Sequence, residues 1–308
     1  MKIVTLTLNP AFDVHCDAEG FTPYTESILK ITSRDAGGKG VNISKALVSA
    51  GVENTAIVVT GSENGDEFCR MLEKDGLDVL QISREGRIRE NITLHEKNNP
   101  ETRISFGGFS VDSTVVDELR RAIGKCDADT VATLTGSIPS GISANAVLNM
   151  LSEMKDAGAK IVIDSRSVTL GEILDFKPWL IKPNRDEAEK YFGTKIESAG
   201  DAACIAKELC SKGVENVMIS LGGDGAVLAT NEGCYYARAP KIEVLSTVGA
   251  GDSMIAGFID GAAKDLHASK RLVRAVAFGT AACMREGTNS PLISDVKLVE
   301  EKTKIVDF

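Results

Sequence analysis

The sequence predicts an α/β fold in which helices cover both faces of a mostly parallel sheet and a small second sheet stands beside it. β-rich runs alternate with helical runs along most of the chain, a pattern typical of parallel strands joined by crossover helices. The chain has 308 residues, 43% of them hydrophobic, which is enough to bury a large core. Two segments, about 11–35 and 87–109, break the alternation with period-two patterns typical of hairpins.

The body strands are expected in apolar runs. The first is "KIVTLTL" at the N-terminus, and the others are "TAIVVTG", "TVATLTG", "KIVIDS", "WLIKPN" and "NVMISLG". Helices are expected between them where small or acidic residues suit a capped start. These starts lie near Val41, Gly65, Ser110, Ser143, Asp186 and Gly200. Near the C-terminus, "SKRLVRAVAFGTAACMRE" predicts a long, largely buried helix that ends in the loop "EGTNSP".

The two exceptional segments predict a small sheet that projects from the body as a lid. In the second segment, "RIRENITLHE" and "ETRISFGGF" flank a polar turn formed by Asn98, Asn99 and Pro100. Neither a linker nor a repeat separates the lid strands from the rest. We therefore expect residues 1–308 to form a single domain with a lid from about 11–35 and 87–109.

Composition excludes several classes of function. With 35 Lys and Arg against 44 Asp and Glu, the formal charge of -9 argues against nucleic acid and anionic membranes as partners. No window has the length and apolarity of a membrane-spanning helix, and "MKIVTLTLNP" lacks signal-peptide features, so we expect a cytoplasmic location. The 7 cysteines are scattered without a C-x-x-C pair and indicate neither a disulfide framework nor a zinc site.

The stretch "STVGAGDSMIAGFI" indicates a site for an anion. Gly249, Ala250 and Gly251 open a helix of small and apolar residues, so backbone N–H groups and the helix dipole would converge on a negative group. Asp252 follows directly. Its carboxylate is either an ordinary N-cap or a group that meets a substrate beside the anion.

A second glycine cluster, "AGGKGVN", also leads into a helical run. Gly38 would allow close backbone approach, Lys39 supplies a cation, and Asn42 supplies a donor and an acceptor. The alternative is a flexible turn with a solvated lysine. The cluster does not satisfy the Walker A pattern, and neither cluster gives a dinucleotide fingerprint, which disfavours a Rossmann-type dehydrogenase.

Six motifs together resemble the PfkB branch of the ribokinase-like sugar kinases across nearly the whole chain. They are, in order, "LNPAFD", "AGGKGVN", "TGSIPSG", "IKPNRDE", "SLGGDGA" and "TVGAGDSMIAGF". The resemblance implies a ribokinase-like three-layer α/β/α fold with a small β-sheet lid, and a kinase that uses ATP and Mg²⁺. "GGKGVN" and "KPN" narrow it to the branch that contains 1-phosphofructokinase, tagatose-6-phosphate kinase and the minor 6-phosphofructokinase.

The resemblance also resolves the role of Asp252. It implies that Asp252 accepts the proton of the attacking sugar hydroxyl, while the amides of Gly249, Ala250 and Gly251 hold the transferred phosphoryl charge. Physical reasoning agrees, because phosphoryl transfer needs a positioned nucleophile beside a charge-stabilising site.

On the ATP side, the resemblance implies that Asn184 and Glu187 of "KPNRDE" organise Mg²⁺. One carboxylate with ATP oxygens is sufficient for this ion, although Glu187 could equally be a first-turn helix residue. Lys182 is placed near ATP by the resemblance, or is an ordinary strand-end lysine. For the adenine side it indicates the "SLGGDGA" loop, with Ser220, Gly223 and Gly225, and the segment "AFGTAACMREGT".

On the sugar side, the resemblance places Lys39, Arg89 and Ser137 at the phosphate already on the sugar. Arg103 aligns with a second arginine that only some members carry. The alternative for both arginines is an exposed position on the hairpin strands. Asp13 matches an aspartate that binds sugar hydroxyls, or is a turn residue after Pro10. Asn9, Gly38 and Asn42 complete the expected pocket.

The expected reaction is ATP-dependent phosphorylation of a ketohexose phosphate, with D-fructose 1-phosphate converted to fructose 1,6-bisphosphate. Tagatose 6-phosphate or fructose 6-phosphate, phosphorylated at the 1-hydroxyl, is the alternative, because Arg103 departs from the commonest 1-phosphofructokinase pattern. A non-catalytic sugar-phosphate sensor is a further alternative, which the retained Asp252 argues against. The resemblance and the cost of open strand edges also predict a homodimer through the lid.

Overall fold

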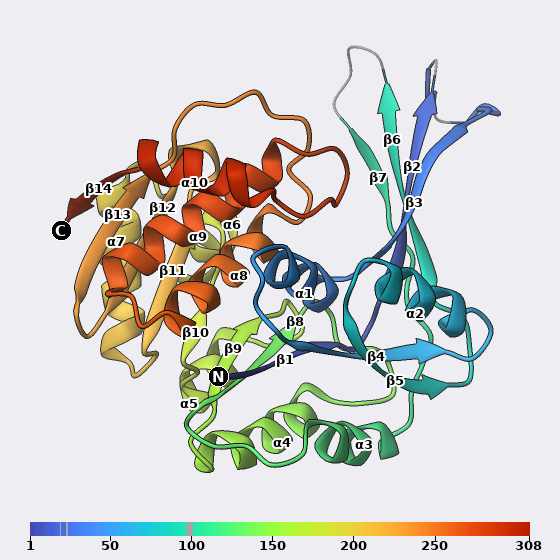
Figure 1. The fold of residues 1–308 in the computed structure, drawn as a ribbon, viewed down its shortest axis with the longest axis horizontal. Coiled ribbons are helices and arrows are strands. Elements are labelled where there is room, and N and C mark those ends of the chain that lie inside the picture. Colours follow the sequence, from blue (N-terminus) through green and yellow to red (C-terminus); the bar gives the residue numbers. More distant parts are fainter. Residues whose placement is uncertain (19, 23, 97–100) are drawn as a thin grey trace.

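The computed structural model describes residues 1–18, 20–22, 24–96 and 101–308, and the structural statements below refer to this part of the chain. It consists of a large α/β body and a smaller sheet that stands beside the body (Figure 1). This arrangement confirms the predicted fold class. The expected turn at Asn98, Asn99 and Pro100 lies outside the described residues.

The body contains a ten-stranded sheet. In chain order its strands are β1 (Lys2–Thr7), β4 (Thr55–Gly61), β5 (Asp78–Arg84), β8 (Thr130–Thr135), β9 (Lys160–Asp164), β10 (Leu180–Ile181), β11 (Asn216–Ser220), β12 (Ala226–Thr230), β13 (Gly233–Arg238) and β14 (Lys304–Asp307). Their order in space is β14-β13-β12-β11-β10-β9-β8-β1-β4-β5. Pairings from β5 to β11 are parallel, whereas β12, β13 and β14 extend the sheet with antiparallel pairings.

Helices cover both faces of this sheet, as the alternation of the sequence predicts. The helices are α1 (Lys39–Ser49), α2 (Gly65–Lys74), α3 (Thr114–Ile123), α4 (Ala144–Asp156), α5 (Leu170–Phe176), α6 (Arg185–Phe192), α7 (Ala199–Ser211), α8 (Ala250–Ala263), α9 (Ala268–Cys283) and α10 (Ile293–Lys302), with a short 3₁₀ turn, η1 (Gly222–Asp224). Alternate residues of a strand point to opposite faces. In β1, Val4 and Leu6 pack in the core with α3, α4 and α7, whereas Ile3 packs with α1, α8, α9 and α10.

One predicted helix start is displaced. The helix expected near Ser110 begins at Thr114, because the Asp112 side chain accepts a hydrogen bond from the Thr114 amide and forms a turn first. The other expected starts agree within a few residues, and the long C-terminal helix is α9.

The small sheet is the predicted lid. It contains β2 (Ala11–Ala18), β3 (Lys30–Gly37), β6 (Arg89–Glu96) and β7 (Thr102–Ile104) in the order β3-β2-β6-β7. The strands fall within the two segments with period-two patterns, and they rise from the body beside α1 and α2 (Figure 1). At its base the lid is anchored by Phe12, which packs edge to face on Phe68 of α2.

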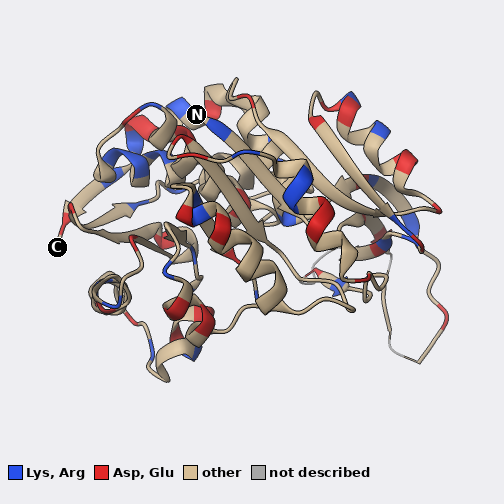
Figure 2. Cartoon of the chain, turned by 90° about the horizontal axis from the view of Figure 1, so that it is seen from below, with Lys and Arg blue, Asp and Glu red and all other residues tan. Residues whose placement is uncertain are grey.

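Charged residues of both signs are spread over this fold. Acidic and basic residues are interspersed along the surface elements (Figure 2), so an anionic ligand must be held by local donors rather than by one basic face. Within the described ranges no helix has both the length and the apolarity to cross a membrane.

Candidate active site

The two glycine clusters open two helices that pack together on one face of the body sheet. Helix α8 begins at Ala250 after Gly249, whose φ of 76° is the left-handed conformation that glycine favours. Helix α1 begins at Lys39 after Gly38, whose φ is 131°. The structure thus brings residues about 210 positions apart into one site: Asn42 Nδ2 donates to Asp252 Oδ2 at 2.8 Å.

Asp252 is a buried carboxylate in the first turn of α8 rather than at its N-cap. It is 7% exposed, and the N-cap position of α8 belongs to Gly249, so the capping alternative does not describe this residue. Burial raises the pKa of Asp252 to about 6, against the opposing effects of Lys39 and Asn42. A carboxylate with a pKa near the working pH is suited to accept a proton.

Lys39 lies between two carboxylates. Its ammonium is 3.0 Å from Asp164 Oδ2, at the end of β9. Burial alone would lower the pKa of Lys39, but the attraction of Asp164 and Asp252 outweighs burial and raises it. Lys39 was expected at the sugar phosphate with Arg89. The structure directs its ammonium to Asp164, and its stem passes the loop that carries Ser137, 3.7 Å from an ideal Cβ on Gly136.

Asp164 is a buried site residue that the motif analysis missed. Lys182 Nζ lies 3.8 Å from the same Asp164 Oδ2, and both side chains are more than nine-tenths buried. Burial would raise the pKa of Asp164, but Lys182 and Lys39 together lower it, so the carboxylate stays ionised. An aspartate that ends the strand pattern "KIVIDS" was the available signal, because the carboxyl ends of parallel strands are where α/β folds bind ligands.

Asn184 and Glu187 form a reciprocal cap at the start of α6. Asn184 Oδ1 accepts from the Glu187 amide at 2.8 Å, and Glu187 Oε2 accepts from the Asn184 amide at 3.1 Å. One of the two Glu187 carboxylate oxygens, Oε2, therefore caps the start of α6, as the alternative of a first-turn helix residue predicts. The other, Oε1, is 3.0 Å from Arg166 Nε, whose side chain is 81% exposed.

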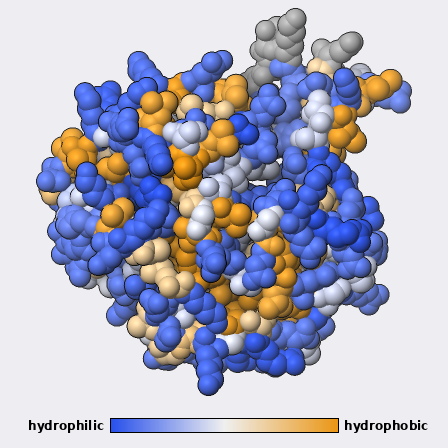
Figure 3. Space-filling model, in the orientation of Figure 1, coloured by the Kyte–Doolittle hydropathy of each residue, from blue (hydrophilic) through white to orange (hydrophobic). Residues whose placement is uncertain are grey.

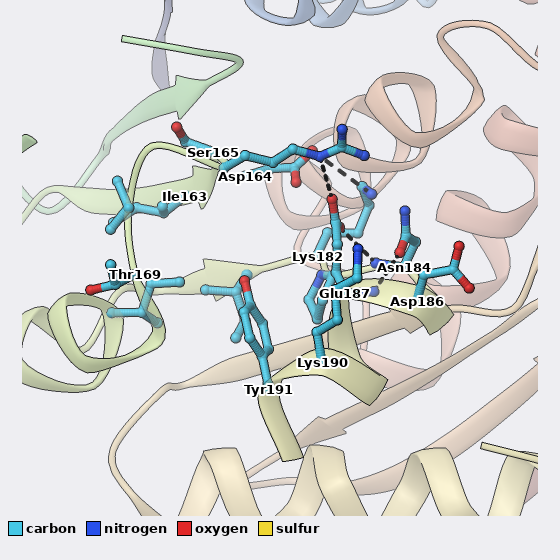
Figure 4. A pocket seen from close by; sticks show the side chains of 15 residues that line it. Ile163, Asp164, Ser165, Thr169, Lys182, Asn184, Asp186, Glu187, Lys190 and Tyr191 are labelled. Carbon is cyan, nitrogen blue, oxygen red and sulfur yellow. Dashed lines mark hydrogen bonds and ion pairs between the residues drawn. The ribbon is translucent and has the colours of Figure 1, made fainter. Parts of the chain in front are cut away.

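A cavity of about 370 Å³ lies between α6 and the loop that follows β9. Figure 4 shows the Asp164, Lys182, Asn184 and Glu187 side chains gathered at one end of it. The donor set here is carboxylate and amide oxygen, which suits Mg²⁺. No cluster of three or more His, Cys, Asp or Glu side chains that could hold a metal ion occurs within the ranges the structure describes.

A second cavity, of about 280 Å³, lies on the other side of Gly251. Small and apolar residues on β11, η1, α8 and α9 line it, together with the loop before α8. They include the predicted Ser220, Gly223 and Gly225, and also Ala250, Gly251, Met254, Val276, Gly279, Thr280 and Cys283. An ideal Cβ on Gly251 would come within 3.0 Å of Lys182 Nζ, so glycine lets this ammonium approach the start of α8. A flat, apolar group with an anionic tail fits this surface.

The sugar-side residues lie where the lid meets the body. Asn9 Nδ2 donates to Ser137 Oγ at 2.9 Å, and Arg89 donates to the Asn9 carbonyl at 3.3 Å and to the Phe106 carbonyl at 2.7 Å. The structure therefore brings Arg89, Ser137 and Asn9 together. Arg103 stands across from Thr93 in the lid sheet and is exposed.

Asp13 lies on the same face of the lid as Arg89 and faces the glycine cluster. An ideal Cβ on Gly37 would lie 2.1 Å from Asp13 Oδ2, so only glycine leaves room for this carboxylate. Asn91 Nδ2 donates to Asp13 Oδ1 at 3.2 Å. Burial raises the pKa of Asp13, while Asn91 and Arg103 oppose that rise.

Known proteins are similar to this chain in sequence and in architecture. A family model described as pfkB family carbohydrate kinase matches residues 7–295. A 1-phosphofructokinase of Escherichia coli strain K12 is 35% identical over 269 residues, covering 84% of each chain. A 1-phosphofructokinase of Vibrio cholerae serotype O1 is 32% identical over 287 residues, covering 93% of this chain and 90% of the relative.

Solved structures agree on the fold. The crystal structure of phosphofructokinase-2 from Escherichia coli in complex with substrates and products has a TM-score of 0.92 and 24% identity, and the match covers 98% of this chain and 99% of that chain. At this identity the likeness bears on the fold, and it confirms the predicted three layers with a lid.

Proposed function

The chain belongs to the pfkB family of carbohydrate kinases, and from this premise we propose that it uses ATP to phosphorylate D-fructose 1-phosphate at the 6-hydroxyl, giving fructose 1,6-bisphosphate. The observation that carries the proposal is the buried Asp252 carboxylate next to the glycine-initiated start of α8. A sugar-phosphate sensor would need the anion site but would not need a base beside it.

In the proposed reaction, Asp252 accepts the proton of the sugar hydroxyl as its oxygen attacks the γ-phosphorus. The bond between the γ-phosphorus and the bridging oxygen of ADP breaks on the opposite side, so ADP leaves with the electron pair. The amides of Gly249, Ala250 and Gly251 donate to the oxygens of the transferred group. The Asn42 amide holds the Asp252 carboxylate in place.

Lys39 and Lys182 supply positive charge on the two sides of this transfer. Lys182 lies beside Gly251 and Asp164, next to the proposed γ-phosphate position. Lys39 lies closer to the sugar, between Asp164 and Asp252. We propose that Lys39 neutralises the transferred phosphoryl group rather than anchoring the existing sugar phosphate, because its ammonium points to Asp164 and not to Arg89.

We propose that Glu187 and Asp164 hold Mg²⁺ and its waters. The residues fit the ion: both offer carboxylate oxygens, and the only side-chain partner of Glu187 Oε1 within the described residues is the exposed Arg166. When bound, Mg²⁺ would neutralise the phosphate oxygens of ATP. Asn184 keeps Glu187 oriented through the reciprocal cap at the start of α6.

The nucleotide is proposed to occupy the 280 Å³ cavity. Its small and apolar lining suits the adenine ring, and Ser220, Gly223 and Gly225, at the end of β11 and around η1, would lie beside the ribose and phosphates. From there the phosphates reach the start of α8, because Ala250 and Gly251 line the same cavity.

At the sugar end, we propose that Arg89, Arg103 and Ser137 bind the phosphate already on the substrate, and that Asp13 binds its hydroxyls. Each charge-assisted hydrogen bond contributes about 1.5–3 kcal/mol, so two or three of them would strongly disfavour free fructose. Gly38 and Asn9 would form the wall of this pocket. Arg103 also favours the alternative substrates, tagatose 6-phosphate and fructose 6-phosphate, because it adds a second cation on the lid.

We also propose that the protein forms a homodimer through the lid. The lid carries exposed apolar side chains, including Ile28 at 90% exposure and Ile31 at 64%. Figure 3 shows apolar surface on the lid beside hydrophilic surface. Burying such side chains against a second lid would also cover its open strand edges. The oligomeric state in solution, measured by light scattering, tests this proposal.

The substrate proposal is tested by ADP release with MgATP and each of four acceptors: fructose 1-phosphate, fructose 6-phosphate, tagatose 6-phosphate and free fructose. We expect the highest kcat/KM with fructose 1-phosphate. Preference for a 6-phosphate would move the substrate assignment and leave the roles of Asp252 and the anion site in place. Turnover of free fructose alone would refute the phosphate-binding role of Arg89, and no turnover would favour the sensor.

A further inference from the structure

Three side chains form a continuous polar chain on the lid: Glu101, His95 and His15. His15 Nδ1 lies 2.9 Å from His95 Nε2, and the two rings stack at an interplanar angle of 17°. His95 Nδ1 lies 3.4 Å from Glu101 Oε1. His15 follows Asp13 by two residues on β2, so both side chains lie on the same face of the lid.

The order of donors in this chain follows from its carboxylate end. We assign the tautomers from this end: the nearby Glu101 carboxylate favours a proton on His95 Nδ1, which leaves His95 Nε2 as an acceptor. His95 Nε2 then accepts a hydrogen bond from the Nδ1–H group of His15. The remaining nitrogen, His15 Nε2, therefore carries no proton, and it has no hydrogen-bond partner within the described part of the chain.

His15 Nε2 faces the body rather than solvent. The residue is only 4% exposed, and an ideal Cβ on Gly287 would lie 3.3 Å from Nε2. Gly287 adopts a φ of 59°, so its bare backbone sits against the imidazole. Its loop follows α9, and the last residue of α9, Cys283, lines the proposed nucleotide cavity. His15 is thus a point where the lid contacts the loop that follows α9.

We propose that His15 is a positioning residue that, in its neutral form, holds the lid against the Gly287 loop and thereby places Asp13 at the sugar. The inference rests on the proposed function for the identity of the sugar site. A second proton on His15 enters at Nε2, leaves the 2.9 Å bond to His95 in place and puts a cation against the Gly287 backbone. The lid contact is then lost at acidic pH.

Burial and the charges around His15 determine the pH at which it binds the second proton. Asp13 on β2, Asp35 on β3 and Glu101 before β7 favour the imidazolium, whereas His95 on β6 opposes it. From the body, the contacting residue is the uncharged Gly287, with Arg285 and Glu286 preceding it in the chain. Burial is the largest influence, and with His95 it lowers the pKa of His15 below its usual value of 6.5. The neutral form therefore prevails at pH 7.5.

Two substitutions separate the contacts of His15. His15→Asn keeps a short amide that can bond His95 but cannot reach Gly287, whereas His15→Gln reaches further and does not titrate. We expect His15→Asn to raise the KM for the sugar phosphate about five-fold at pH 7.5, about the size of one lost buried methylene contact, because the shorter amide leaves the Gly287 backbone without its packing partner. The kcat and the KM for ATP should be nearly unchanged. We expect His15→Gln to restore the wild-type KM.

The pH profile distinguishes positioning from a merely structural role. Between pH 7.5 and 5.5, the KM for the sugar phosphate should rise more steeply in the wild type than in His15→Gln. The substrate phosphate itself titrates near pH 6, but it does so equally for every variant. His267→Asn is the matched control: it removes an exposed histidine from the start of α9 with a residue that also caps helices, and should change neither KM nor profile.

Equal KM values in His15→Asn and wild type, or the same pH profile in His15→Gln and wild type, would overturn the proposal. Hydrogen–deuterium exchange without substrate separates this failure from failure of the proposed function. At one pH, His15→Asn should increase exchange in residues 11–18 and 285–290 and leave the strands of the body unchanged. Unchanged exchange in both segments would also overturn it, whatever substrate the enzyme uses.

Discussion

Replacement of Asp252 by Asn should abolish most turnover and at the same time stabilise the protein. The carboxylate is 7% exposed, and burial raises its pKa from 3.8 to about 6. A buried acid with a raised pKa contributes stability while it is protonated, fully below pH 3.8, and that stability is lost as the pH rises through about 6. The shift of about two pH units corresponds to about 3 kcal/mol. At pH 7.5 the wild type lacks this stability.

The amide introduced by Asp252→Asn is never ionised, so the unfolding free energy of this variant should exceed that of the wild type by up to about 3 kcal/mol at pH 7.5, and the difference should vanish near pH 3.5. Urea unfolding at several pH values measures it. Turnover should fall by about 10²–10⁴, the usual contribution of a general base. Binding of ATP and sugar phosphate should persist in calorimetry, because the amide oxygen can still accept from Asn42.

Asp260→Asn is a matched control on the same helix. Asp260 is fully buried and bonds Arg274 and Lys264, so losing its charge should destabilise the protein by about 3 kcal/mol without a specific loss of turnover. The two substitutions thus have opposite expected signs. Near wild-type turnover in Asp252→Asn, or a stability change like that of Asp260→Asn, would refute the reasoning about the base.

Three further substitutions test other parts of the site. Arg103→Ala should raise the KM for the sugar phosphate about ten-fold, as expected for one lost charge-assisted bond, and a change in the KM for ATP alone would contradict the lid placement. Glu187→Gln should raise the Mg²⁺ concentration needed for half-maximal rate without changing the stability of the protein to urea, because glutamine also completes the reciprocal cap; an unchanged Mg²⁺ requirement would remove Glu187 from the ion site. Gly37→Ala should displace Asp13 and raise the KM for the sugar phosphate, whereas Gly107→Ala, with nothing within 4 Å of its added Cβ, should not; equal effects would show that the lid tolerates the methyl group.

The parallel half of the sheet and the lid were predictable, because their patterns are local. "TAIVVTG" and "TVATLTG" are short apolar runs between turn signals, and the lid strands alternate with period two. The antiparallel strands that extend the sheet beyond β11, namely β12, β13 and β14, were not predicted. Its last strand, β14, consists of four exposed residues, so no burial pattern distinguishes it from a loop.

The motifs identified Asp252, Gly249 and Glu187, but the sequence could not show which charges meet. Lys39 and Asp164 are 125 positions apart, and their contact depends on where α1 and β9 end in the folded sheet. The family resemblance implied Lys39 as a partner of Arg89, and only the fold shows that its ammonium turns to Asp164. The dual use of Glu187, with one oxygen in the helix cap and one toward the cavity, likewise depends on side-chain geometry.

The charges of the site support the proposal that a divalent cation accompanies ATP. Around the start of α8, Asp252, Asp164 and Glu187 face two ammonium groups, Lys39 and Lys182. With all carboxylates ionised this set carries one excess negative charge, which repels the phosphates that the anion site must hold. Arg166 offsets Glu187, but its side chain is 81% exposed, and such ion pairs are worth at most about 1 kcal/mol. A divalent ion arriving with ATP can therefore displace Arg166 at little cost and reverse the sign of the local charge.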